Sequence, residues 1–402
     1  MYAIYSLAAL MTSLLTLTHK RKSLKIFIIL SCVIPSSFAF ETQVSVLGIY
    51  FFEHFYWVAL PISAIFIVKK GIPKKLKIVA IAILIYFAYV LSAVYLYNGE
   101  PKYLIRDIRP LITLTAPLLL ICLFRKITLS PSEIDKIIVI SSTATIATYI
   151  TILLGILSFS NAFYDEENRY RYFGICTYLC CAYVISAFTN PATNKTNLRR
   201  LAITLSLVVV LISGYRVFII AVLLSVVMSN IKNPATFIKV ALLSIAMLFT
   251  GVQVAINLGI ERITSALSLS GILTQLTTRF SPAMAHINNY EFSNYIFGSG
   301  LGTTFLIPWF DYQNLDTRNN TVDSTYITLY VKIGIFSIIY VLALLRLASY
   351  DAPDRAKTAS LIFCGIIMLT FPIAYHPALA IYILSFYLMN KREPLQQWKI
   401  TN

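Results

Sequence analysis

The sequence predicts an all-α polytopic membrane protein, a single integral membrane domain over residues 1–402 with about 11–14 transmembrane helices and one large loop. Three observations support this fold class. Apolar residues make up 58% of the chain and charged residues 12%, whereas soluble domains carry about 45–50% and about 25%. Long apolar runs recur along the chain, and basic clusters separate them at every second loop. Soluble, disordered and fibrous classes of protein are therefore excluded.

The apolar runs define the spans. A transmembrane helix needs about 20 mostly apolar residues. The predicted spans are 2–18, 24–40, 46–68, 77–97, 108–124, 137–158, 172–189, 199–213, 215–230, 237–256, 325–345, 359–374 and 377–390. The first run has no basic region ahead of it, so we interpret it as a retained span and not as a cleaved signal peptide. Thirteen spans place the N-terminus outside and the C-terminus in the cytoplasm.

The basic clusters predict the orientation of these spans. They hold 23 of the 33 Lys and Arg and 5 of the 17 Asp and Glu, a balance of +18, which accounts for the whole net charge of +16. By the positive-inside rule, the clustered side is cytoplasmic. This placement explains the basic charge without nucleic acid as a partner. The clusters are His19–Lys25, Lys69–Lys77, Arg125–Lys136, Lys195–Arg200, Lys232–Lys239, Arg346–Lys357 and Lys391–Lys399.

The outer side carries arginine where the cytoplasmic side carries lysine. Eight of its ten basic residues are Arg. Any cation suits topology, but a planar guanidinium binds phosphate or carboxylate in a bidentate manner. The outer arginines therefore indicate a site for a phosphorylated or acidic ligand, with salt bridges to outer acids as the alternative. They are Arg106, Arg109, Arg169, Arg171, Arg216, Arg262, Arg279 and Arg318.

Most outer loops are short. Asn98–Pro110 carries two of these arginines three residues apart, which places them on one face if the segment is helical. Ser158–Arg171 carries two more among acidic and aromatic residues. Asn257–Ser324 is the one long loop, and loops of this length are commonly functional, so we interpret it as a lid or substrate platform. Within it, Ser281 as N-cap and Pro282 in the first turn predict a helix that runs to about residue 295.

Neither a metal nor a cofactor is expected. The six cysteines lie in apolar runs without a CxxC pair, and the four histidines are scattered. The outer side also shows no DxD-like acidic pair that would hold a metal ion. We interpret the cysteines as small buried residues.

Four features in chain order resemble the O-antigen polymerase and ligase superfamily. The first is the Ser213–Arg216 turn, SGYR, between two spans. The second is Arg279-Phe280 in the long loop, and the third is the glycine run NYIFGSGLG over Asn294–Gly302. The fourth is Asp323-Ser324, nine residues, and then Gly334–Ser337. In this last motif Asp323 stands where the ligases carry a histidine that is proposed to be catalytic.

That departure disfavours a ligase and favours a Wzy-type O-antigen polymerase. The resemblance implies a GT-C-like, metal-independent glycosyltransferase of the bacterial inner membrane whose active site faces the periplasm. It would join oligosaccharide repeat units carried on undecaprenyl pyrophosphate, transferring the growing chain to the incoming unit. The implied partners are these lipid-linked oligosaccharides, the lipid bilayer and a Wzz-type chain-length co-polymerase. An O-antigen ligase and a lipid-linked oligosaccharide flippase or transporter are the alternatives.

The implied chemistry selects candidate residues. A pyrophosphate leaving group gains negative charge as the glycosidic bond breaks, and preorganised cations stabilise such charge. We therefore expect Arg216 and Arg279 to bind the pyrophosphate. The alternatives are an interfacial position for Arg216 and a salt bridge from Arg279 to Glu291 or Asp311. Further substrate-binding candidates are Arg262, Arg318, Arg106, Arg109, Arg169 and Arg171.

His286 and Asp323 are the remaining catalytic candidates. His286 shares a helical face with Arg279 if the helix continues through Pro282, and it would accept a proton from the acceptor hydroxyl or orient phosphate. A solvated loop histidine is the alternative. Asp323 acts as a base or binds the acceptor sugar, or else it is the N-cap of the next span. Lys332, about 13 Å along that span, is expected to be paired or to line a cavity.

Overall fold

The computed structural model describes residues 7–8, 10–12, 14–15, 19–34, 71–96, 99–156, 172–190, 196–231, 242, 269–307, 317–376 and 378–391. These residues are mostly helical and include one antiparallel pair of two-residue strands. They agree with the predicted all-α class. The predicted span 46–68 lies outside the described residues, as does 237–256 apart from Leu242, and only part of 2–18 is described.

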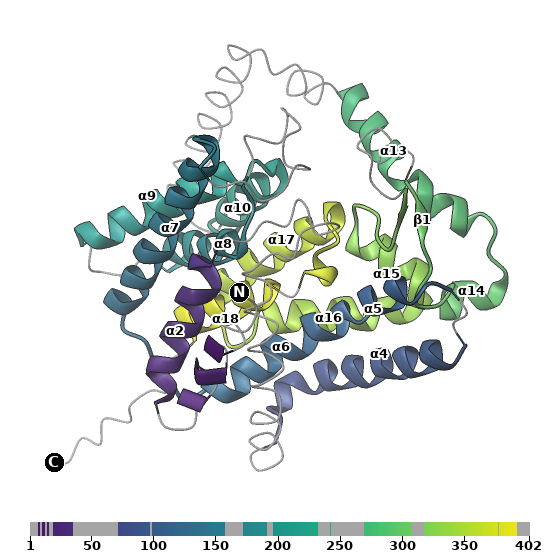
Figure 1. Cartoon of the computed structure of the whole chain (residues 1–402), viewed down its shortest axis with the longest axis horizontal. Helices are drawn as coiled ribbons and strands as arrows, with labels where there is room; N and C mark the ends of the chain where they lie inside the picture. Colours follow the sequence, from purple (N-terminus) through teal and green to yellow (C-terminus); the bar gives the residue numbers. More distant parts are fainter. Residues whose placement is uncertain are drawn as a thin grey trace.

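Figure 1 shows the described helices of the first half of the chain. They are α2 (Lys20–Val33), η1 (Lys74–Leu76), α4 (Lys77–Leu96), α5 (Pro101–Arg106), α6 (Arg109–Phe124), α7 (Pro131–Leu153), α8 (Ile175–Thr189), α9 (Asn197–Ile212) and α10 (Arg216–Ser229).

The second half begins with the described part of the predicted long loop and then returns to apolar helices. Its elements are α13 (Leu269–Ile287), α14 (Phe292–Phe297), β1 (Phe305–Leu306), β2 (Arg318–Asn319), α15 (Thr325–Ile333), η4 (Gly334–Phe336), α16 (Ser337–Ala348), α17 (Asp354–Thr370), η5 (Ile373–Tyr375) and α18 (Leu379–Asn390).

Four helical stretches of the described chain are long and apolar enough to cross a membrane. They are Lys74–Leu96, Pro101–Phe124, Pro131–Leu153 and Thr325–Ala348. Each coincides with a predicted span, which supports a membrane protein. The predicted spans at α8, α9, α10, α17 and α18 are also helical, but these helices are shorter.

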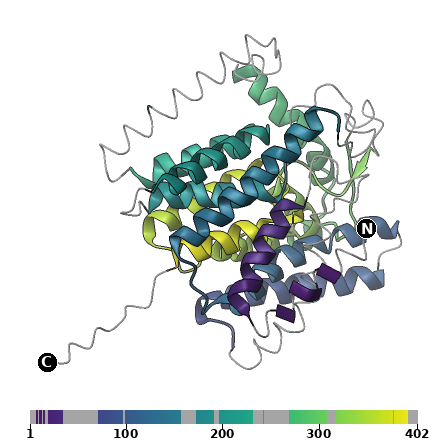
Figure 2. The same ribbon diagram turned by 60° about the vertical axis from the view of Figure 1, so that its left-hand side comes forward.

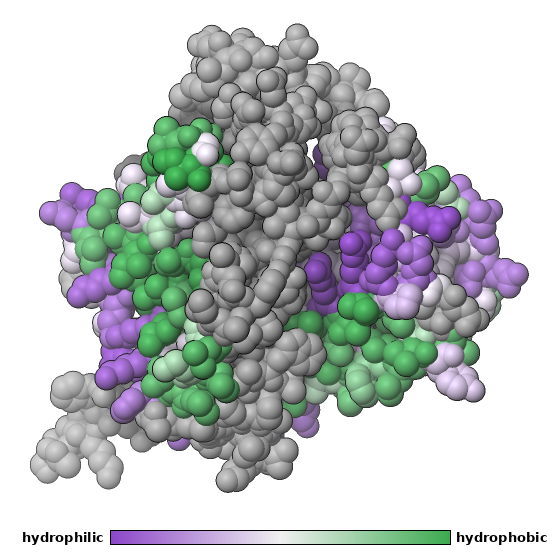
Figure 3. Space-filling model, viewed as in Figure 1, coloured by the Kyte–Doolittle hydropathy of each residue, from purple (hydrophilic) through white to green (hydrophobic). Residues whose placement is uncertain are grey.

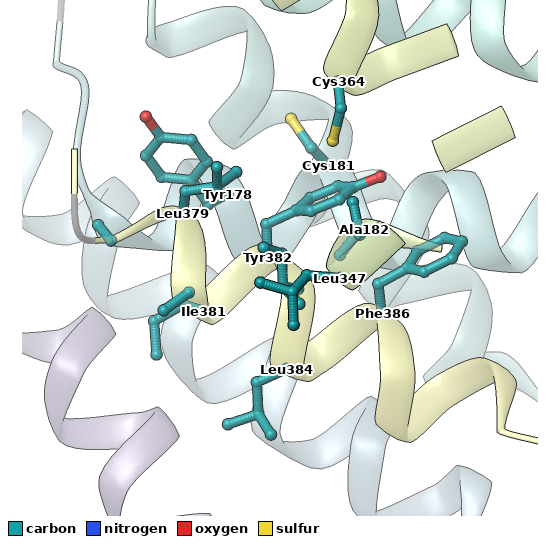
Figure 4. Packing of buried hydrophobic residues seen from close by; sticks show 14 of the residues in the cluster. Tyr178, Cys181, Ala182, Leu347, Cys364, Leu379, Ile381, Tyr382, Leu384 and Phe386 are labelled. Carbon is teal, nitrogen blue, oxygen red and sulfur yellow. The ribbon is translucent and has the colours of Figure 1, made fainter. Parts of the chain in front are cut away.

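The core lies around α8 and α18, which pack against each other and are buried on nearly every face. A helix that is apolar all round is stable only when it is enclosed in this way. Figure 4 shows Cys364 of α17 pointing toward Tyr382 of α18, and Cys181 of α8 lies near the same ring. All six cysteines are free, and five are fully buried, as predicted.

The remaining helices surround this core. In Figures 1 and 2, α9 and α2 lie alongside α7, and α8 packs on α9. The helix α4 lies at the edge, where it contacts α16 and α6. Its Leu84, Leu91 and Leu96 are more than half exposed. Figure 3 shows an apolar surface over this helix. A large exposed apolar face of this kind indicates contact with lipid.

The helix predicted to begin at Ser281 is placed wrongly. α13 already begins at Leu269 and continues through Pro282 to Ile287, and α14 is a separate helix. Proline inside a helix leaves the carbonyl four residues earlier without its N–H donor. Here that carbonyl belongs to Thr278, and the Ser281 hydroxyl donates to it at 2.8 Å. The Ser-Pro pair therefore stabilises a helix interior and not a helix start.

The basic clusters that were predicted to be cytoplasmic contact one another. Arg346 Nε donates to the Lys75 carbonyl at 3.0 Å. Arg21 pairs with Glu133 through a short contact, and Lys391 donates to the Ile127 carbonyl. These contacts link clusters from both ends of the chain.

The predicted outer loops and the outer ends of the neighbouring spans likewise contact one another. Asn320 Nδ2 donates to the Tyr103 carbonyl at 2.6 Å, and Thr325 Oγ1 donates to the Phe371 carbonyl at 2.9 Å. The Tyr215 ring packs against Phe371 with 5.6 Å between centroids. These contacts follow the predicted alternation of loops between two faces, while the assignment of one face to the periplasm stays a prediction.

Candidate functional site

Two residues that the sequence singled out form an ion pair. Arg279 Nη1 lies 3.0 Å from Asp323 Oδ2, and the two side chains are about half exposed, at 51% and 43%. Arg279 lies within α13, and Asp323 stands two residues before α15. The predicted partner Glu291 is therefore not the one that the structure gives Arg279, and the other predicted partner, Asp311, lies outside the described residues.

Asp323 is not the N-cap of α15. That position belongs to Ser324, whose side chain accepts a hydrogen bond from the Ile327 N–H. Because Ser324 supplies the cap, the Asp323 carboxylate is left to face Arg279. Partial loss of hydration raises the pKa of the half-exposed Asp323 carboxyl, while the Arg279 guanidinium opposes that shift. A carboxylate that is both accessible and easier to protonate is suited to acid–base chemistry.

The end of α10 that carries Arg216 lies on the same side of the bundle as this pair. Tyr215 packs against Phe371, and the Phe371 carbonyl accepts a hydrogen bond from Thr325, two residues after Asp323. Arg216 is the first residue of α10, after a turn in which Gly214 has φ +64°. The side chain of Arg216 lies outside the described part of the structure. Its backbone position fits the prediction that Arg216 and Arg279 serve one site.

His286 lies on the face of α13 that carries Arg279, because seven residues are almost two full turns. The condition for this shared face, a helix that continues through Pro282, is met. His286 Nε2 lies 3.0 Å from the Thr304 carbonyl, and its ring meets Phe305 edge to face. A carbonyl only accepts, so Nε2 carries the proton and Nδ1 is the basic nitrogen of the neutral ring.

A groove of about 550 Å³ runs along this part of α13. It is lined by Ser281, Pro282, Ala285, His286, Asn289, Tyr290, Asn294, Ser299 and Leu306. Figure 3 shows hydrophilic residues gathered on this side of the molecule, next to the apolar surface over α4. The histidine is therefore a groove residue and not a solvated loop residue.

The described residues include a buried ion pair, of which the sequence predicted one partner, Lys332, but not the other, Asp107. Lys332 Nζ lies 2.6 Å from both oxygens of Asp107, and neither side chain is exposed. The Thr303 carbonyl is the third acceptor of Lys332, at 3.0 Å. Asp107 also accepts from the Gly302 N–H and from Asn320 Nδ2. Lys332 was expected to be paired, but its partner Asp107 was not identified.

The glycine run docks on the end of α15. The Ser299 N–H donates to the Val331 carbonyl at 2.7 Å, and the Gly300 N–H donates to the Lys332 carbonyl at 3.0 Å. These carbonyls lack helical partners because α15 ends at Ile333. A Cβ on Gly298 would stand 2.4 Å from the backbone of Lys332. The run therefore fixes α14 and the groove to the membrane helices by backbone contact.

The other candidate arginines are more scattered. Arg106 ends α5 and Arg109 begins α6, and the two residues between them, Asp107 and Ile108, keep right-handed helical backbone angles. Arg318 is exposed in β2, next to Asn319, which pairs with Phe305. The predicted site residues Arg169, Arg171 and Arg262 lie outside the described residues.

Metal ligands do not gather in the described residues, where no group of three His, Cys, Asp or Glu could hold an ion.

The model of one protein family, described as a family of unknown function (DUF6369), matches residues 21–394 of the chain. No curated protein matches the sequence.

Proposed function

For this chain, which belongs to DUF6369, a family of unknown function, we propose a role as a membrane glycosyltransferase of the polysaccharide-polymerase kind. It joins oligosaccharide units carried on undecaprenyl pyrophosphate at the outer face of a bacterial inner membrane. The observation that carries this proposal is the accessible Arg279–Asp323 pair beside the His286 groove.

The proposed reaction exchanges one bond to an anomeric carbon for another. The bond from that carbon to the phosphate oxygen breaks, and undecaprenyl pyrophosphate leaves with the electron pair. The hydroxyl oxygen of the acceptor sugar forms the new glycosidic bond, and its proton passes to a base. The protein must therefore supply a cation for the leaving group and an acceptor for one proton.

Arg279 supplies the cation in this scheme. Its half-exposed guanidinium is held by only one described carboxylate, at 3.0 Å, so a pyrophosphate is able to replace or join that partner. Arg216, at the same end of the bundle, would be the second cation. Removing one preorganised donor of this kind costs about 10²–10³ in rate.

Asp323 and His286 are the two candidates for the proton acceptor. Asp323 touches Arg279 directly, so it also orients the guanidinium. His286 has Nδ1 as its basic nitrogen. It lines the groove and lies on the same helix, α13, as Arg279. The resemblance in sequence assigns the Asp323 position to catalysis, which favours Asp323 as the base and His286 as a group that contacts substrate.

Gene deletion in the native host tests the proposal. The deleted strain is complemented with wild type, Arg279→Ala, Asp323→Asn or Arg200→Ala, and its surface polysaccharide is separated on a gel. Arg200 is an exposed arginine of α9 on the predicted cytoplasmic side and serves as the matched control. We expect a single repeat unit without a ladder for the deletion and the two site variants, and a normal ladder for Arg200→Ala.

The alternatives give different gels. A ligase would leave a bare acceptor lipid and retain polymer on its carrier. A ladder that survives deletion would contradict polymerisation altogether and bring a transport function forward. Protein levels measured on immunoblots separate loss of activity from loss of the protein.

A further inference from the structure

We propose that the groove between α13 and α14 binds a neutral carbohydrate, and that it is the subsite for the acceptor sugar rather than for the pyrophosphate. This assignment rests on the proposed function only in naming the sugar as the acceptor. The groove itself is argued from its own side chains.

The polar lining of the groove is uncharged. Its hydrogen-bonding side chains are Ser281, His286, Asn289, Tyr290, Asn294 and Ser299. A phosphate or a carboxylate would require a cation, and the nearest described candidate, Arg279, does not line the groove and is paired with Asp323. A volume of about 550 Å³ lies within the range of small-molecule sites, about 300–1,000 Å³.

Several of these side chains have hydrogen-bond donors or acceptors that no described residue uses. Asn294 is partly buried, and its side-chain amide makes no hydrogen bond with any described residue. Asn289 uses Nδ2 on the Ala285 carbonyl, which leaves its oxygen as an acceptor. His286 uses Nε2 on Thr304, which leaves Nδ1. These open hydrogen-bonding positions are suited to a ligand that brings its own donors and acceptors. The effect is greatest at the partly buried Asn294 and His286, because a buried polar group that lacks a hydrogen bond costs free energy.

Sugar hydroxyls match this set because each is both a donor and an acceptor. The Asn294 amide offers the same combination, whereas the Asn289 oxygen and His286 Nδ1 accept only. A purely apolar ligand would leave all three groups unpaired. The unpaired groups therefore favour a polyhydroxylated ligand.

Tyr290 supplies a fixed aromatic wall. Its hydroxyl donates to the Val331 carbonyl at 2.9 Å and accepts from the Ser299 hydroxyl at 3.2 Å. The Tyr295 ring meets it edge to face, with 5.4 Å between centroids. These contacts hold the ring in place before a ligand arrives, so a C–H face of a sugar can pack on it with little loss of side-chain entropy.

The position of the groove also fits an acceptor. Arg279 lies one turn before Pro282 on α13, which is about 5 Å along the helix axis. A sugar in the groove would therefore lie beside the cation that is proposed to hold the leaving group. The two halves of the reaction, one charged and one neutral, then occupy neighbouring parts of one helix.

Saturation-transfer NMR on the full-length protein in nanodiscs tests this inference. The probes are the methyl glycosides of glucose, galactose, mannose, rhamnose and N-acetylglucosamine at millimolar concentration. We expect transfer to the ring protons of at least one sugar, and about a tenfold loss of affinity in Asn294→Ala. Asn288→Ala is the matched control, because Asn288 adjoins Asn289 but does not line the groove.

Three results would overturn the inference. They are the absence of transfer to every sugar in the wild type, unchanged affinity in Asn294→Ala, and displacement of the sugar by inorganic pyrophosphate, which would make the groove an anion site. The proposed function fails separately. Sugar binding that depends on Asn294 in a protein whose deletion leaves the polysaccharide ladder intact would keep the groove and remove the polymerase.

Discussion

Breaking the Asp107–Lys332 pair should destabilise the protein more than any change at its surface. Both side chains are fully buried, and Lys332 Nζ has no acceptors among the described residues beyond Asp107 and the Thr303 carbonyl. Removing one partner of a buried pair leaves the other charge without compensation and costs about 3–5 kcal/mol. The loss of stability in Lys332→Met should lie at the lower end of this range, because Asp107 keeps its hydrogen bonds from the Gly302 N–H and from Asn320.

Replacing both partners should restore much of that loss. In Asp107→Asn/Lys332→Met neither buried charge is left alone, and neutral replacements of a buried pair are often close to neutral in stability. We therefore expect a coupling free energy of at least about 2 kcal/mol, within the range for residues in direct contact. Lys75→Met is the surface control: its ammonium lies 4.0 Å from Asp351 and is 66% exposed, so its loss should cost less than about 1 kcal/mol.

The cysteines of the protein provide the assay. Because five are buried and none is in a disulfide, a thiol-reactive fluorescent dye reports unfolding on heating. At about 2 °C per kcal/mol, each single variant should lower Tm by about 6–10 °C. A fall of less than 2 °C in both single variants would refute the reasoning. A double variant that loses the sum of the two single losses would refute it as well.

Three further predictions concern the site and its anchor. Gly298→Ala should destabilise the protein by several °C in Tm in the same dye assay, because its Cβ would meet the Lys332 backbone at 2.4 Å; Gly300→Ala, which shares a positive φ but has open space, should lose clearly less. Arg279→Lys should keep Tm and lose most of the polymerising activity, since a point charge replaces the bidentate fork; full activity would contradict the pyrophosphate role. The raised pKa of Asp323 means that its carboxylate is protonated at a higher pH than an ordinary aspartate, so the activity should fall as pH drops through that pKa. Asp323→Asn should remove this acid limb from what activity remains, measured as polymer formed against pH, and an unchanged pH profile would exclude Asp323 as the base.

The sequence predicts positions at this site better than it predicts partners. Arg279 and Asp323 both stand out, one as an outer arginine and one within a spaced motif. Their contact was not foreseen, because the acids nearest to Arg279 in the sequence offered equally good charges. Asp323 comes close to Arg279 because α13 packs on α15, which begins two residues after Asp323. Pairing across such a distance in the sequence depends on tertiary structure.

Asp107 shows the same limit more strongly. The lysine within an apolar span is a clear signal, since burying an unpaired cation is costly. The aspartate lies in a loop with two arginines, where a salt bridge at the surface is the simpler interpretation. Only the turn between α5 and α6 brings it into the core beneath the glycine run. Asp107 could have been identified by asking which carboxylate pairs with the buried Lys332.

The structural roles of one proline and two glycines were not predicted from the sequence. Pro282 suggested a helix start, yet the adjacent hydroxyl of Ser281 satisfies the carbonyl that the proline leaves open. Gly298 and Gly334 were recognised as parts of motifs, but their role is the close approach of two backbones. A Cβ on Gly334 would stand 2.2 Å from the Ile296 carbonyl oxygen. Such contacts between distant segments leave no spacing signal in the sequence.

Reconstitution tests the central claim most directly. Purified wild type and Arg279→Ala are placed in liposomes with undecaprenyl-pyrophosphate-linked repeat units from the native host, and both polymer and released undecaprenyl pyrophosphate are measured. The account predicts a ladder of polymer from the wild type without added metal or nucleotide sugar, one released carrier for each bond formed, and a loss of about 10²–10³ in rate for Arg279→Ala. The absence of polymer from a correctly folded wild-type protein, or an equal rate from Arg279→Ala, would contradict it.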